Sequence, residues 1–161
     1  SGDITPGTTI LDAFKSAVVD SNSIHYSKDG SDLSRSDVVV VVIGEKPYSE
    51  GVGDRDSLHL SDDDLKLLKK VKNSNLPHVV ILISGRPMII NEVLDDSDAF
   101  IAAWLPGTEG SGISDVMFGD FDFTGTLSMT WPKSMNQIPI NYGDTNYDPL
   151  FQFGFGLSYN E

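Results

Sequence analysis

The stretch VVVVVIGEKPYSEGVGDRDS, residues 38–57, decides the fold. Its first six residues are apolar and β-branched without interruption, which is typical of a strand covered on both faces in a parallel sheet. Glycines, a proline and charged side chains follow, and they predict an exposed loop. Two later apolar runs, 78–84 and 99–105, are predicted to be strands of the same sheet.

Helical patterns separate these apolar runs. Apolar residues recur at helical spacing over 10–18, and a second helix follows Ser61, whose hydroxyl is a suitable N-cap. Leu65, Leu68 and Val71 are predicted to form the buried side of that second helix. A short helix is expected to end near Leu94, and a fourth is expected before Gly119, with three inward residues: Ile113, Val116 and Met117.

The alternation of strands and helices predicts an α/β fold. We expect a mostly parallel sheet with helices on both faces, an α/β sandwich of the flavodoxin-like type, forming one domain over residues 1–161. Short additional strands are predicted at 24–26 and 126–131, whereas 139–159 has no clear period. Ligands of such sheets bind at the carboxyl ends of the strands, where the loop 44–57 lies.

Composition argues against several classes of function. The chain of 161 residues has a formal net charge of −13 and no cysteine. A surface this negative disfavours nucleic-acid binding, and the lack of cysteine removes disulfides and thiolate chemistry. The sequence contains no run of about 20 apolar residues, so no membrane-spanning helix is predicted. Ser1-Gly2-Asp3 carries no signal peptide, and we expect it to be either an engineered boundary or a cut within a longer chain, so the missing signal does not indicate the cytoplasm.

Local motifs leave carboxylate chemistry as the main candidate. The glycine-rich stretch 107–112 lacks the spacing of a phosphate loop, so we expect its glycines to serve strand–helix packing. The three histidines are scattered, no nucleophile elbow is present, and the aspartates lack the order of a calcium loop. Glu50 lies at the tip of the exposed loop, whereas Glu45 lies next to the strand and is a candidate polar plug or helix cap.

Six segments in a fixed order resemble the second domain of glycoside hydrolase family 3, the β-glucosidases and exo-β-glucanases. They are 37–45 (DVVVVVIGE), 50–60 (EGVGDRDSLHL), 104–110 (WLPGTEG), 115–120 (DVMFGD), 125–132 (GTLSMTWP) and 153–159 (FGFGLSY). The sequence of residues 44–50, GEKPYSE, is most similar to that of the exo-β-glucanase branch.

The resemblance implies a retaining glycosidase that releases β-glucosyl residues from non-reducing ends of a β-glucan or β-glucoside. Its nucleophile is then an aspartate in a preceding (β/α)8 barrel, and Glu50 is the catalytic acid/base on this domain. Tyr48 and Arg55 are candidates for binding substrate and positioning the acid, although Asp54 and Arg55 are equally candidates for a local ion pair that shapes the loop. Two carboxylates suffice for this chemistry, so no metal or cofactor is expected.

The resemblance also implies a secreted or periplasmic protein. Because no barrel lies within the 161 residues, we expect this chain alone to be inactive. One alternative is a non-catalytic carbohydrate-binding or interaction module, suggested by the aromatic residues from Trp131 to Tyr159, which are able to stack on sugars or to pack internally. Another is a flavodoxin-like regulatory or nucleotide domain, suggested by fold analogy alone.

Overall fold

The computed structural model describes residues 5–160, and the terminal segment Ser1-Gly2-Asp3 lies outside them. Three parallel strands form one sheet in the order β1-β2-β3: β1 (Val39–Gly44), β2 (His78–Ile83) and β3 (Ala99–Trp104). Val39 pairs with His78, and Val79 pairs with Ala99. The predicted parallel α/β sheet is therefore confirmed, with strand bounds within one residue of those expected.

Four helices connect and cover the strands: α1 (Ile10–Ala17), α2 (Asp62–Lys72), α3 (Asn91–Leu94) and α4 (Gly110–Met117). Short 3₁₀ turns occur at Ser21–Ser23, Leu33–Arg35 and Met135–Gln137. Thr9 and Ser61 cap α1 and α2, since each side chain accepts a hydrogen bond from the backbone N–H three residues later. The Ser61 cap confirms the prediction from sequence.

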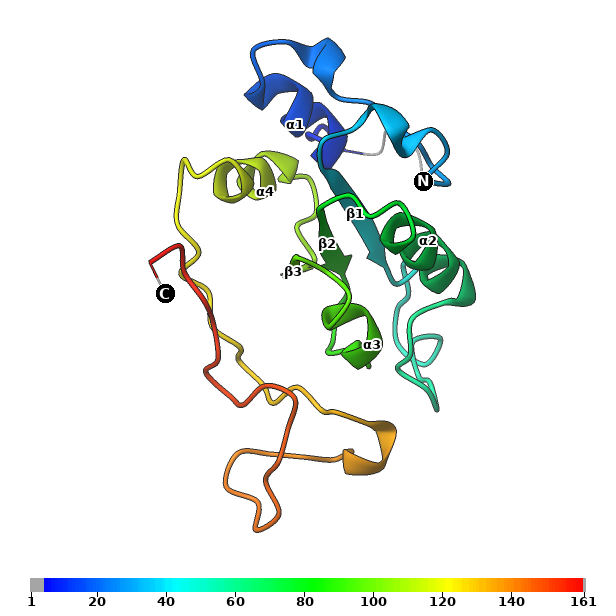
Figure 1. Ribbon diagram of the computed structural model, residues 1–161. Coiled ribbons are helices and arrows are strands. Elements are labelled where there is room, and N and C mark those ends of the chain that lie inside the picture. The colour runs from blue at the N-terminus through cyan, green and yellow to red at the C-terminus, as the bar shows by residue number, and fades with distance from the viewer. Residues whose placement is uncertain (1–4, 161) are drawn as a thin grey trace.

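The helices lie on both faces of the sheet, as predicted (Figure 1). On one face, Val41 and Val80 pack with Leu68 and Val71 of α2 in the larger core. On the other face, Ile81 packs with Phe14 of α1 and with Ile113 of α4 in a second core. Burial on both faces is most complete in β2, which explains why that strand is continuously apolar rather than alternating, whereas Val42 of β1 is 43% exposed.

The glycine-rich start of α4 serves packing, as expected. Gly110 is buried against the segment before α1, and a Cβ placed on it would lie 2.5 Å from the carbonyl oxygen of Thr8. The Gly110 amide also donates to that oxygen at 3.0 Å. The glycine therefore permits the close approach of α4 to the N-terminal segment.

Three sequence predictions about secondary structure and burial are wrong. Residues 24–26 form no strand, and neither do 126–131, where only Trp131 makes an isolated antiparallel bridge to Phe151. Leu65 was expected on the buried side of α2 but is 38% exposed. The inward side of α2 instead carries Leu68 and Val71, which are buried, and Leu67, which is half-buried against the same core.

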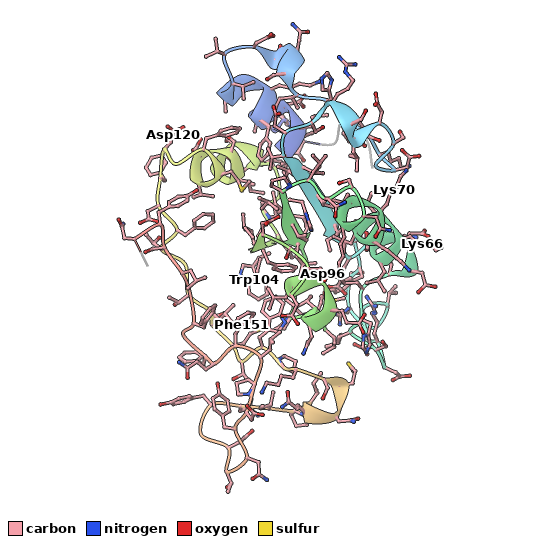
Figure 2. All side chains as sticks on the ribbon, in the orientation of Figure 1. Lys66, Lys70, Asp96, Trp104, Asp120 and Phe151 are labelled. Carbon is pink, nitrogen blue, oxygen red and sulfur yellow. The ribbon has the colours of Figure 1, made fainter. Side chains whose placement is uncertain are left out.

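The segment from Gly119 to Asn160, called the tail below, contains no strand and only one 3₁₀ turn. Two of its arms run side by side and away from the sheet (Figure 1). Backbone hydrogen bonds join the arms: Leu127 N–H donates to Phe155, and Trp131 N–H donates to Phe151. At the junction with the sheet, Trp104 of β3 lies near Phe151 of the tail (Figure 2).

Candidate active site

The candidate site lies at the carboxyl edge of the sheet, where β1 and β2 end side by side. Glu45 directly follows β1, and its backbone N–H donates to the carbonyl of Ile83 at 3.0 Å, which extends the pairing with β2. Arg86 follows β2 by three residues. Because the strands are parallel neighbours, their carboxyl ends bring Glu45 and Arg86 together, although the two are 41 residues apart in sequence.

The Glu45 carboxylate is enclosed by cations and a phenol, with only 4% of the side chain exposed. Its Oε1 accepts from Arg86 Nε and Nη2, at 3.1 and 2.8 Å, and from Arg55 Nη1 at 3.0 Å. Its Oε2 accepts from the Tyr48 hydroxyl at 3.2 Å. Burial raises the pKa of Glu45, but hydrogen bonds and positive charge from Arg86, aided by Tyr48 and Arg55, outweigh it and hold the pKa below its ordinary value.

Arg86 is the site residue that sequence reasoning missed. Its guanidinium lies 4.6 Å from the centre of the Tyr48 ring, a cation–π distance, while donating twice to Glu45. These hydrogen bonds raise the pKa of Arg86 above its already high ordinary value. A signal was available: an arginine lies three residues after one buried parallel strand, and a glutamate lies directly after the neighbouring strand.

Tyr48 is 41% exposed, and its hydroxyl is engaged by Glu45. Burial of the hydroxyl and the negative charge of Glu45 raise the Tyr48 pKa. Arg55 donates to Glu45 and, through Nη2, to the carbonyl of His59 at 3.2 Å. The candidate ion pair between Asp54 and Arg55 is therefore wrong, because Arg55 pairs with Glu45 instead.

Glu50 lies at the exposed tip of the loop, in a tight hydrogen-bonded turn. Gly53 N–H donates to Ser49, and Asp54 N–H donates to Gly51, both at 3.1 Å. Gly51 has a φ of +63°, a left-handed conformation that favours glycine next to Glu50. Among residues 5–160, no side chain or backbone group forms a hydrogen bond or ion pair with the Glu50 carboxylate, which leaves it free to meet a group from outside.

The histidines and the other acidic residues of the described chain do not come together in one place. His78 is buried at the start of β2, with Nδ1 3.1 Å from the carbonyl of Leu76, whereas His25 and His59 are exposed and far apart in the sequence. Within the described residues, no group of three or more His, Asp or Glu side chains lies close enough to hold a metal ion. None of the helices over the same range has the length and apolar character needed to cross a bilayer.

Comparison with known proteins places the chain in a family. The family model described as the glycosyl hydrolase family 3 C-terminal domain matches residues 1–159. This chain belongs to glycoside hydrolase family 3. The match spans nearly the whole sequence, so it covers the sheet, the Glu50 loop and the tail together.

Individual relatives of this family 3 domain are glycosidases. A β-xylosidase of Formosa agariphila is 33% identical over 94% of this chain and 25% of its own length. A periplasmic β-glucosidase of Salmonella typhimurium is 32% identical over 78% of this chain and 19% of its own. A crystal structure of an exo-1,3/1,4-β-glucanase variant from a Pseudoalteromonas species superimposes with a TM-score of 0.89 and 44% identity, over 96% of this chain and 27% of that one.

The family 3 domain thus spans a quarter or less of the curated relatives just described. The relatives are multidomain enzymes in which other parts of the chain make up the remainder. Fold and family are shared over this domain, and the α/β sandwich predicted from sequence is confirmed by the superposition.

Proposed function

We propose that this domain supplies the catalytic acid/base, Glu50, to a retaining β-glucosidase or exo-β-1,3/1,4-glucanase. The observation that carries the proposal is the placement of Glu50: its carboxylate projects without an internal partner from a closed loop at the carboxyl edge of the sheet. Because no internal donor engages it, this carboxylate is accessible to a substrate that binds at the edge of the sheet. The names of the relatives support the class of reaction.

In this proposal Glu50 acts twice. It first protonates the departing glycosidic oxygen while a second carboxylate attacks the sugar, and it then deprotonates the water that releases the sugar. Retaining enzymes hold the two carboxyl groups about 5–5.5 Å apart, so the nucleophile must approach the loop tip from outside the described residues. We assign it to a (β/α)8 barrel that precedes this domain in the longer enzyme, and the isolated chain is then inactive.

Tyr48 and Arg55 are proposed to contact the substrate from the base of the loop. Tyr48 is 41% exposed and is proposed to offer part of its ring to a sugar, although its hydroxyl donates to Glu45. The Arg55 side chain is 38% exposed and uses two of its nitrogens internally. The substrate class is a β-glucan or β-glucoside with a free non-reducing end, and the two carboxylates need no metal or organic cofactor.

The alternative, a non-catalytic carbohydrate-binding module, has less support because several tail aromatics pack internally. Trp131 is 1% exposed, and the Phe151 and Phe155 rings stack at 4.5 Å. Tyr142 is 75% exposed, but its ring contacts those of Tyr147 and Phe153. Tight sugar binding by this chain alone, measured by tryptophan fluorescence, would favour the module.

The proposal is tested by Glu50→Ala in the longer enzyme, with an activated aryl β-glucoside as substrate. General acid–base catalysis contributes about 10²–10⁴-fold, so we expect a loss of that order in kcat. Azide needs no deprotonation and is expected to restore turnover, with β-glucosyl azide as product. The exposed Glu92→Ala is the matched control and should retain full activity. Unchanged activity of Glu50→Ala would place the acid elsewhere.

A further inference from the structure

We propose that Glu45, held by Arg86, is a positioning residue that fixes the loop carrying Glu50. The Glu45 clasp, as we call Glu45 with Tyr48, Arg55 and Arg86, ties this loop to the segment after β2. The inference rests on the proposed role of Glu50 and extends it to residues that do not meet the reacting atoms. It follows from three features of the loop: its base, its ring contact and its exit.

The base of the loop is closed by an ion pair. Glu45 and Arg55 are joined at 3.0 Å across ten residues, and Glu50 lies midway between them. The same carboxylate oxygen accepts two hydrogen bonds from Arg86, a side-on fork that fixes direction as well as distance. The tip is therefore a short loop mounted on a rigid strand end rather than a free chain.

The Tyr48 ring fills the space that two glycines leave. A Cβ on Gly53 would lie 2.3 Å from Tyr48 Cδ2, and one on Gly85 would lie 2.9 Å from the Tyr48 hydroxyl. The ring thus contacts both the returning loop and the segment after β2, with the Arg86 guanidinium over one face, and the residue remains 41% exposed. In the proposal, this contact fixes the position of the turn 49–54 relative to the sheet.

The exit of the loop is attached to the same segment after β2. Arg55 Nη2 donates to the carbonyl of His59, and Ile89 N–H donates to the carbonyl of Leu58 at 2.8 Å. Arg86 and Ile89 therefore hold the two ends of the loop from one short stretch of chain. Only the turn bearing Glu50 projects beyond these attachments.

The chemistry of Glu45 suits positioning and not acid catalysis. Both of its oxygens accept hydrogen bonds from donors of the clasp, and two guanidinium groups balance its charge. A general acid must carry a proton and reach its substrate, and Glu45 does neither in this arrangement. Its role is to hold Glu50 at the geometry that proton transfer requires.

The test is Glu45→Gln in the longer enzyme, assayed with a poor and a good leaving group. Phenyl β-glucoside needs protonation of its leaving oxygen, whereas 2,4-dinitrophenyl β-glucoside does not. Because misplacement by about 1 Å can cost about 10²-fold, we expect kcat/KM for the phenyl substrate to fall about 10–100-fold. The dinitrophenyl substrate should lose far less, and hydrogen exchange in 46–57 should accelerate.

A separate ion pair provides the control. Lys72→Met breaks the pair between Lys72 and Asp96, away from the loop, and should change neither the substrate ratio nor loop exchange. Should Glu45→Gln fail to fold, Arg86→Lys keeps the charge but loses the fork, and the same selective loss is expected at smaller size.

The outcomes separate the two proposals. If Glu50→Ala is inactive but the clasp variants leave both the substrate ratio and loop exchange unchanged, the clasp proposal is overturned while the proposed function stands. Full activity in Glu50→Ala would overturn the proposed function. Faster exchange with an equal loss on both substrates would reduce Glu45 to a structural residue and also overturn the positioning role.

Discussion

At the scale of single residues, the most informative side chain is Glu45. Burying a carboxylate in a domain of net charge −13 costs free energy of desolvation and repulsion. Two guanidinium groups, those of Arg55 and Arg86, lie beside the Glu45 carboxylate and offset this cost. A pair of this kind is weak evidence for stability in itself, but removing one member leaves the other charges without a partner. We therefore expect substitution of Glu45 alone to destabilise the domain.

Glu45 should make the stability of the domain depend on pH in a definite direction. Its pKa in the folded state lies below the ordinary value of 4.5, so its contribution is fully present above that value and is lost as pH falls through the folded pKa. We expect Glu45→Gln to be less stable than the wild type at pH 7. The two unfolding free energies should converge as the pH is lowered below 4.5, since the wild-type carboxylate then becomes neutral.

Urea unfolding at several pH values between 7 and 3 measures this difference. The exposed Glu92→Gln serves as the control, and its difference from wild type should stay near zero throughout. A Glu45→Gln deficit that is constant over the whole range would contradict the prediction, because it would show that the negative charge does not stabilise the fold.

Sequence reasoning at this scale succeeded where chemistry is local and failed where it is not. Gly51 follows Glu50 in the sequence, so an exposed turn was predictable from neighbouring residues alone. The pairing of Arg55 with Glu45 was not, because the closing of the loop brings residues ten positions apart into contact and displaces the adjacent Asp54 as the partner. Arg86 was missed because its partner is 41 residues away.

At the scale of secondary-structure elements, the strands were predictable because burial on both faces demands continuous apolar runs. Residues 24–26 and 126–131 failed for a physical reason: a short β-prone segment becomes a strand only when a partner lies in register. In the second segment Leu127 and Trp131 each form backbone hydrogen bonds with the opposite arm, but these contacts are separated and only the Trp131–Phe151 pair forms a bridge, so no continuous strand forms. Helix starts were more reliable, since a cap acts within four residues.

The cap of α2 provides a prediction at this scale. Ser61 Oγ accepts from the Asp64 N–H at 3.2 Å, and its hydroxyl donates to the Asp64 carboxylate at 2.7 Å. Ser61→Ala should lower the free energy of unfolding by about 1 kcal/mol. In α1, Ser16 donates instead to the Asp12 carbonyl within the helix, so Ser16→Ala should change stability by less than about 0.5 kcal/mol.

Chemical denaturation of both variants decides this prediction. Equal losses for Ser61→Ala and Ser16→Ala would show that the hydroxyl at the helix start has no special role. An unchanged slope of unfolding free energy against denaturant is also expected, because neither serine affects how much surface the fold buries.

At the scale of the whole molecule, the segment 85–90 joins the sheet to both of its outlying parts. Arg86 and Ile89 hold the Glu50 loop, and the carbonyl of Met88 accepts from the indole Nε1–H of Trp131 at 2.7 Å. Trp131 also lies 5.9 Å from Trp104 and 6.3 Å from Phe151, ring centre to ring centre. The buried indole anchors the irregular tail to the larger core, against which Leu127, Leu150 and Phe151 of the tail also pack.

Trp131→Ala should therefore detach the tail as well as destabilise the core. Trp131 is 1% exposed, and deleting a buried aromatic side chain of this size costs about 3–5 kcal/mol, to which the unpartnered Met88 carbonyl contributes. Limited proteolysis should then cut within 119–160 well before the sheet is digested. Phe121→Ala removes an aromatic ring from the same tail, but one that is 66% exposed, so it should change stability by no more than about 0.5 kcal/mol and leave the cutting rate unaltered. If the tail of Trp131→Ala stayed as resistant as that of Phe121→Ala, the hydrogen bonds between its two arms would have to hold it without the indole, and segment 85–90 would not be the joint between sheet and tail.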